Sequence, residues 1–193
     1  MVVDIGGGTT DIAVISLGGI VVSKALKIAG DKFNADIVAY LRSEFKILIG
    51  EKTSEEIKIA VASVASRREP LMVIVRGRDL VTGLPREVTI NDHDVRNAIG
   101  HDIEELIESV KEVLETTPPE LVADIMQRGI YLAGGGALIR GLPQYLTASL
   151  GVPVVVAPDP LTAVVRGTAI VLDDIESYRE ALLRSDDELV PTE

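Results

Sequence analysis

Short runs of Val and Ile alternate with glycine-rich turns over the first thirty residues. Met1–Ile5 is apolar and stops at glycines, whereas Thr10–Leu17 alternates and is rich in β-branched residues. Ile20–Ile28 resumes the pattern after Gly18-Gly19, a two-residue turn of the kind that joins hairpin strands. The pattern therefore predicts three antiparallel strands, with the glycine-rich turn after Met1–Ile5 joining the first two.

Helical spacing replaces this alternation after Gly30. Apolar side chains recur on one face of two segments, and Thr53 or Ser54 can cap the second of them. A hairpin follows, with Gly77, Gly83 and Pro85 in or near its turn. The expected helices and strands are Asp31–Phe45, Ser54–Ser66, Leu71–Val75 and Glu87–Ile90. These elements predict a small α+β unit, residues 31–100, inserted into a larger one.

Helices and strands alternate in the remaining part of the chain. Asn91-Asp92 can cap a helix, or a broken pair of helices, that runs to about Glu115. The elements expected after it are the helix Glu120–Gln127, the strand Ile130–Ala133, the helix Leu142–Leu150, the strand Val152–Ala157, and the helices Leu161–Leu172 and Ile175–Arg184. We therefore expect an α/β unit made of residues 1–30 and 101–185. The acidic tail, residues 186–193, is predicted to be disordered.

Composition narrows the function classes. The chain has 193 residues and a net charge of -11, so a nucleic-acid footprint, which is normally basic, is disfavoured and no nucleic-acid partner is expected. The sequence contains no cysteine, which excludes disulfides, thiolate metal sites and cysteine nucleophiles. No apolar run approaches the roughly 20 residues that a membrane-spanning helix needs. Because Met1 leads straight into a strand and a ligand loop, we expect an upstream region to be missing.

The turn Asp4–Thr10 holds three consecutive glycines followed by two threonines. Glycine backbone N–H groups that converge in a tight turn form an anion-binding nest, and Asp4 is placed to hold a hydrated Mg²⁺. The turn lacks the Gly-Lys-Ser/Thr ending of a Walker A motif and joins two strands, so it is neither a P-loop nor a Rossmann turn. An ordinary hairpin turn is the alternative, but it needs only one or two glycines.

Two further motifs could complete a nucleotide site. Ile130–Leu138 is again a strand that ends in three glycines, which would let a base or ribose approach the backbone, although close helix–strand packing explains them too. Glu55 and Lys58 lie three residues apart on one helical face, a spacing more often found on a solvated surface. A carboxylate suits ribose hydroxyls, and a lysine can lie along an adenine. His93 and His101 have no companion pattern for a metal.

The order of these motifs resembles the actin superfamily, which also holds heat-shock chaperones and sugar kinases, and most closely its MreB family of bacterial actins. Val2–Leu17 looks like the second phosphate loop of that family, and Leu48–Lys58 is similar to its ribose and adenine helix. Leu132–Gly141 resembles the adenosine motif of that family, and Thr116–Leu121 resembles the stretch that leads into it. Asp159–Val164 is similar to the last connecting helix.

The resemblance implies an RNase H-like, actin-type ATPase subdomain with a mixed five-stranded sheet and helices, plus the small inserted α+β subdomain. It also implies binding of ATP and Mg²⁺, and self-association into filaments that direct cell-wall synthesis and rod shape. Such filaments would lie in the cytoplasm beneath the inner membrane, with cell-shape membrane proteins as partners. Membrane contact would be made only through the N-terminal half that is absent here.

Site residues are carried over by the same resemblance. The phosphates would be held by Gly6, Gly7, Gly8, Thr9 and Thr10, and Asp4 would touch the Mg²⁺ shell. Ribose and adenine would meet Glu55 and Lys58, with Glu56 and Ile57 in the same binding segment. The adenosine would be lined by Gly134, Gly135, Gly136 and Ala137. Thr10 would act catalytically by orienting the attacking water.

The first half of the family's site is absent, including a matching phosphate loop and a catalytic Glu. We therefore expect little ATPase activity and no normal filaments from the chain alone. The alternatives within the superfamily are a plasmid-segregation or division protein and half of a sugar or acetate kinase. No catalytic base for a substrate hydroxyl is evident, and no substrate-binding domain of the chaperone type follows.

Overall fold

A mixed five-stranded sheet joins strands from the first thirty residues to strands between residues 130 and 156. The computed structural model describes residues 1–66 and 68–178. The strand order is β3-β2-β1-β7-β8, antiparallel over the first three strands and parallel over the last three. The strands are β1 (Val2–Ile5), β2 (Thr10–Ser16), β3 (Gly19–Leu26), β7 (Ile130–Ala133) and β8 (Val154–Val156). The predicted meander and the mixed sheet are both confirmed.

A second sheet belongs to the segment that the sequence assigns to an insertion. It has three antiparallel strands in the order β4-β5-β6, namely β4 (Ile47–Leu48), β5 (Met72–Asp79) and β6 (Pro85–Asn91). The helices α1 (Gly30–Glu44) and α2 (Glu51–Val61) pack beside it, and α1 buries Phe33, Ile37 and Leu41. The three apolar residues recur at helical spacing, so one stripe of α1 faces the core.

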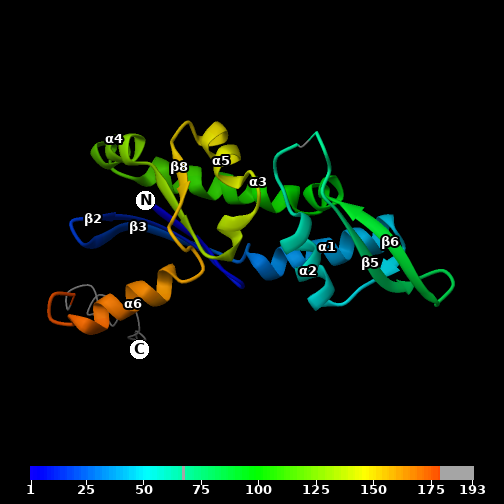
Figure 1. Cartoon of the computed structure of the whole chain (residues 1–193). Helices are drawn as coiled ribbons and strands as arrows, with labels where there is room; N and C mark the ends of the chain where they lie inside the picture. Colours follow the sequence, from blue (N-terminus) through cyan, green and yellow to red (C-terminus); the bar gives the residue numbers. More distant parts are fainter. Residues whose placement is uncertain (67, 179–193) are drawn as a thin grey trace, which may run out of the picture.

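The helix α3 (Asp92–Thr116) runs past both sheets as one continuous element (Figure 1). The Asn91 side chain caps it by accepting hydrogen bonds from the N–H groups of His93 and Asp94. The Asp94 carboxylate in turn accepts a hydrogen bond from the Asn91 N–H. The predicted boundary between residues 100 and 101 lies inside this helix. The division of the chain into two subdomains at that point stays a proposal.

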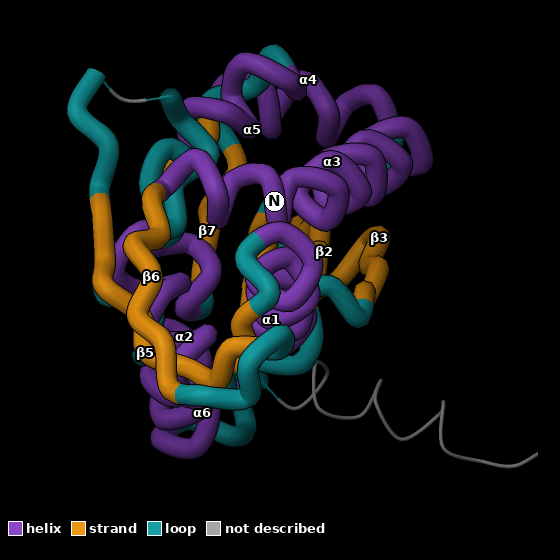
Figure 2. The backbone as a smooth tube through the Cα atoms, turned by 90° about the vertical axis from the view of Figure 1, so that its right-hand side faces the viewer, coloured by secondary structure: helices purple, strands orange, loops and turns teal. Residues whose placement is uncertain are grey.

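Helices cover the five-stranded sheet unequally. In Figures 1 and 2, α3 lies on one side of the sheet with α4 (Pro119–Arg128) and α5 (Leu142–Leu150), whereas α6 (Ala163–Asp173) lies on the other. No residue of α6 is buried, and its exposed side chains include the apolar Val164, Val165 and Ile170. No helix in the described part of the chain is long and apolar enough to cross a membrane.

Several predicted boundaries are wrong. The second helix begins after Gly50, not at Thr53 or Ser54, and ends at Val61, because residues 62–65 make contacts outside the helix. The strand β4 was not predicted, since two residues carry no readable alternation. Residues 174–178 form a turn and not the start of the predicted helix Ile175–Arg184. The rest of that helix and the acidic tail lie outside the described residues.

Candidate nucleotide-binding site

The glycine turn between β1 and β2 is held by its carbonyl groups. Gly6 O accepts a hydrogen bond from Gly30 N at 3.0 Å, and Gly7 O accepts one from Asp31 N at 2.8 Å. Both donors are in the first turn of α1, which has no side-chain cap. Within the described residues the N–H groups of Gly7 and Gly8 have no protein acceptor. These free donors suit an anion such as a phosphate.

The second glycine stretch crosses the end of β1 at van der Waals distance. Gly134 has φ +76°, and a Cβ there would lie 2.3 Å from Ile5 O and 2.5 Å from Asp4 Oδ1. A Cβ on Gly136 would lie 2.2 Å from Ile5 Cγ2. Only glycine fits either position, and the missing side chains let this stretch lie directly against the end of β1, beside the first glycine turn.

The helix α2 supplies the third side of the site. Lys58 Nζ donates to Gly30 O at 2.9 Å, so the ammonium lies beside the turn that holds Gly6 and Gly7. Burial lowers the pKa of Lys58, and the carboxylates of Glu55 and Asp31 oppose that shift. The half-buried ammonium therefore lies beside the residue that holds the glycine turn, Gly30.

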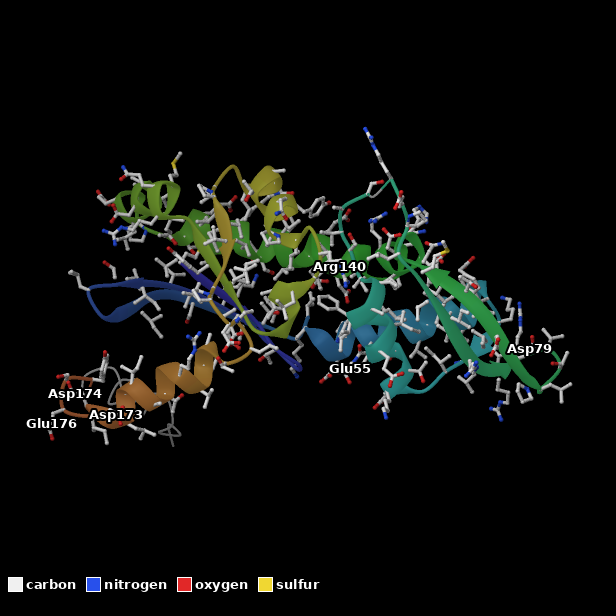
Figure 3. The ribbon with its side chains drawn as sticks, viewed as in Figure 1. Glu55, Asp79, Arg140, Asp173, Asp174 and Glu176 are labelled. Atoms are coloured by element: carbon white, nitrogen blue, oxygen red, sulfur yellow. The ribbon has the colours of Figure 1, made fainter. Side chains whose placement is uncertain are left out.

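These three sides enclose a cleft of about 590 Å³. That volume falls in the range of small-molecule sites, roughly 300–1,000 Å³. Figure 3 labels Glu55 on α2 and Arg140 on the loop beyond η1 (Gly135–Leu138), both in the central part of the molecule. The predicted site residues that line the cleft are Asp4, Gly6, Gly7, Glu55, Lys58, Gly134, Gly135 and Gly136.

The remaining predicted residues lie behind or beside the lining. Thr10 is fully buried, and its hydroxyl donates to Ile28 O at 2.5 Å. Thr9 donates to Asp11. Ile57 and Ala137 are buried in the core, Glu56 is exposed, and Gly8 is exposed at the edge of the turn. In this arrangement the Thr10 hydroxyl points away from the cleft, and its role toward an attacking water stays a prediction.

Sequence reasoning missed part of the lining. Gly30 and Asp31 reach the cleft because α1 begins against the phosphate turn, and a glycine directly before a helical pattern could have signalled this. Ile59 follows Lys58 on α2, four residues after Glu55 and therefore on the same face. The other missed residues are Phe33, Ala62, Leu138, Ile139, Arg140, Pro160, Leu161 and Val164. These depend on tertiary packing that no local pattern shows.

Asp4 places a carboxylate against the second glycine stretch, since its Oδ1 would lie 2.5 Å from a Cβ on Gly134. It is directly opposite Asp11 in the antiparallel pair of β1 and β2. Burial raises the pKa of Asp4, and the like charge of Asp11 raises it further. Among the described residues, no three His, Asp or Glu side chains gather into a metal-binding group. A Mg²⁺ beside Asp4 would therefore take one or two carboxylates and complete its shell with water and phosphate oxygens, which is a donor set that this ion accepts.

Solved structures of related proteins share this fold. The crystal structure of MreB5 of Spiroplasma citri bound to ADP matches 93% of this chain and 54% of its own, with 43% sequence identity and a TM-score of 0.88. A structure of that protein bound to AMPPNP matches with the same values. The MamK double helical filament matches 83% of this chain and 50% of its own, with 26% identity and a TM-score of 0.70. The fold is therefore that of the actin-like proteins.

Relatives at the sequence level identify the branch. Residues 1–180 match the profile of the MreB/Mbl protein family. The cell shape-determining protein Mbl of Bacillus subtilis is 51% identical over 91% of this chain and 53% of its own. The cell shape-determining protein MreB of Escherichia coli is 46% identical over 92% and 51%. The chain belongs to the MreB/Mbl family, and it spans about half the length of these curated relatives. The family resemblance in the sequence is thus confirmed.

Proposed function

We propose that this chain forms one wall of an ATP and Mg²⁺ site in an actin-like cytoskeletal protein. The observation that carries the proposal is the meeting of Gly6–Gly7, Gly134–Gly136 and the α2 pair Glu55 and Lys58 around one cleft. Free amides and an ammonium suit phosphates, and glycines that touch β1 leave flat backbone for a nucleoside. The ADP and AMPPNP structures of MreB5, which shares the fold, support a nucleotide ligand.

Each group has a distinct chemical task in this proposal. The amides of Gly7 and Gly8 and the Lys58 ammonium would bind the β- and γ-phosphate oxygens. The Asp4 carboxylate would hold the hydrated Mg²⁺, which neutralises phosphate charge. Glu55 would accept hydrogen bonds from ribose hydroxyls, while Gly134–Gly136 would lie against the nucleoside.

The cellular role follows from the relatives. Mbl and MreB are named as cell shape-determining proteins, and MamK forms a filament. We propose self-association into filaments beneath the inner membrane that direct cell-wall synthesis and rod shape, with membrane proteins of cell shape as partners. The family match favours this role over a plasmid-segregation or division protein and over half of a sugar or acetate kinase.

Calorimetric titration of the 193-residue chain with AMPPNP and Mg²⁺ tests the site. Saturable binding of one nucleotide, weakened in Lys58→Met, is the expected result. We expect little ATP hydrolysis by this chain, because the matching phosphate loop and the catalytic Glu of the family's site belong to the other wall. Absence of nucleotide binding at millimolar ligand would contradict the proposed site.

A further inference from the structure

The short segment after α2, residues 62–65, is tied to the loop that follows η1. Val64 N donates to Arg140 O at 2.9 Å, and Ser63 forms an isolated parallel bridge with Arg140. The side chain of Arg140 reaches back in the same direction, because its Nη1 donates to Ile59 O, near the end of α2, at 3.2 Å. Arg140 therefore holds the end of α2 with its backbone and with its guanidinium.

A second arginine holds the same segment from the side of α3. Arg96 Nε donates to Ser63 O at 3.0 Å, and its Nη2 donates to Ala65 O at 2.5 Å and to Asp92 Oδ2 at 2.9 Å. Ser63 and Asp92 are almost fully buried. Residues 62–65 are thus fixed to α3, and Arg140 joins this fixed segment to the loop on the five-stranded sheet.

The backbones at this junction approach very closely. Gly141 has φ +80°, and a Cβ there would lie 2.6 Å from Ala65 Cβ. The distance between the loop and the segment after α2 is therefore set by direct contact as well as by hydrogen bonds.

This junction lies at one end of the nucleotide cleft. Glu55, Lys58 and Ile59 line the cleft from α2, whereas Leu138 and Arg140 line it from the loop. Figure 3 shows Arg140 and Glu55 on these two elements in the centre of the molecule. The width of the cleft at this end depends on how α2 and the loop are joined.

We infer that Arg140 is a positioning residue that fixes the spacing between α2 and the loop around the nucleoside end of the cleft. The inference rests on the proposed nucleotide site. The phosphate end is held by different contacts, from Gly30 N to Gly6 O and from Asp31 N to Gly7 O. Lys58, the proposed phosphate ligand on α2, is held by its own hydrogen bond to Gly30 O. Loss of the Arg140 side chain should therefore weaken nucleoside contacts and change phosphate contacts little.

Two ligands separate these ends. Arg140→Met keeps an extended stem but has no donor, whereas Arg140→Lys keeps a donor for the same carbonyl. Arg76→Met is the matched control, because Arg76 is exposed on the outer hairpin and pairs with Glu87. Each variant of the 193-residue chain is titrated with AMPPNP and with inorganic tripolyphosphate, both in Mg²⁺. Amide exchange over residues 59–65 and 134–141 is measured without ligand.

For Arg140→Met we expect AMPPNP affinity to fall about tenfold, because a junction that has lost one hydrogen bond from a charged group would keep the binding-competent spacing only about a tenth of the time. Tripolyphosphate affinity should stay within about twofold of wild type. Exchange over residues 59–65 should become faster, Arg140→Lys should recover most of the affinity, and Arg76→Met should behave as wild type.

An unchanged AMPPNP affinity would overturn the inference, and so would an equal loss for both ligands, which indicates a charge effect or general damage. If wild type binds neither ligand, the proposed nucleotide site fails on its own. The exchange measurement still decides the junction in that case, because unchanged exchange in Arg140→Met means that the guanidinium does not hold α2.

Discussion

Lys58 Nζ donates a hydrogen bond to the carbonyl oxygen of Gly30, 2.9 Å away, and so joins α2 to the start of α1. The N–H of Gly30 donates to Gly6 O. The Lys58 ammonium therefore lies next to the glycine turn between β1 and β2. Desolvation at this position disfavours the charged form of Lys58, and a further negatively charged neighbour would offset that cost. A bound phosphate would supply that charge.

Replacement of Lys58 by Met should therefore weaken nucleotide binding. The substitution removes one charge-assisted hydrogen bond, worth about 1.5–3 kcal/mol, which corresponds to an affinity loss of roughly 10- to 150-fold. Lys52→Met is the control, because Lys52 is an exposed lysine of the same helix that does not line the cleft. Calorimetry with AMPPNP decides the matter, and equal affinities of the two variants would contradict the role of Lys58.

Gly134→Ala should destabilise the fold. An alanine Cβ would lie 2.3 Å from Ile5 O, at a backbone φ of +76° that side chains rarely adopt. Strain and overpacking of this kind together amount to about 2–4 kcal/mol in the free energy of unfolding. In Gly135→Ala the nearest atom would be 3.4 Å away, so about 1 kcal/mol or less is expected. Urea unfolding that gives the same midpoint for both variants would be inconsistent with this close contact.

The Mg²⁺ contribution to nucleotide binding should depend on pH through Asp4. A carboxylate must be ionised to hold Mg²⁺, and the pKa of Asp4 is raised by burial and by Asp11. The Mg²⁺ effect is therefore expected to fade on acidification at a higher pH than for an ordinary Asp. Asp11→Asn removes the opposing like charge, so the midpoint of the pH profile should move to lower pH.

Asp4→Asn is the companion variant and should lose the Mg²⁺ effect at every pH, while keeping some binding of metal-free nucleotide. Titrations with and without Mg²⁺ at several pH values give both profiles. A midpoint that stays in place or moves upward in Asp11→Asn would show that Asp4 is not the group that holds the ion.

Asp79 should stabilise the turn between β5 and β6 only while it is ionised. Its carboxylate accepts hydrogen bonds from the N–H groups of Thr82 and Val81, each at 2.8 Å, and from Arg86. The two backbone donors lower the pKa of Asp79 to about 2. A lowered pKa in the folded state means that the stabilisation is complete above the unfolded value, about 3.9, and is lost as pH falls toward 2.

The destabilisation caused by Asp79→Ala should therefore shrink between about pH 6 and about pH 3. Val81→Ala alters an exposed side chain of the same turn and keeps every donor to the Asp79 carboxylate, so its effect on unfolding should not follow this trend. Urea unfolding at both pH values provides the comparison. A constant difference between wild type and Asp79→Ala would mean that the ionised form has no special role.

All strands except β4 could be predicted, because their own residues show the pattern of a strand. The runs of Val and Ile in β1, β2 and β3 and the Gly18-Gly19 turn are sufficient to predict an antiparallel meander. In contrast, β4 consists of Ile47 and Leu48 and exists because it pairs with the edge of β5. The end of α2 at Val61 likewise depends on distant partners, since the next residues bond to Arg96 and Arg140.

Fewer than half of the residues that line the cleft could be predicted from the sequence. Three consecutive glycines at the end of a strand point to phosphate and nucleoside chemistry by themselves, so Gly6 and Gly134 were found from the residues. Glu55 and Lys58 were assigned only through the family resemblance, because their spacing alone is typical of a solvated surface. Thr10 looked equivalent to its neighbours in sequence, but its position in β2 turns its hydroxyl inward to Ile28 O. Apolar residues such as Leu161 and Val164 line the cleft only because α6 begins beside it.

Amide exchange of the 193-residue chain, measured with and without AMPPNP and Mg²⁺, shows whether nucleotide binds between the three sides of the cleft. We expect slower exchange on nucleotide binding at residues 6–8, 55–59 and 134–138, the three sides of the cleft, and unchanged exchange in the outer turn at residues 80–84. Protection that is absent from these segments, or that falls elsewhere on the chain, would contradict the assignment of the nucleotide site.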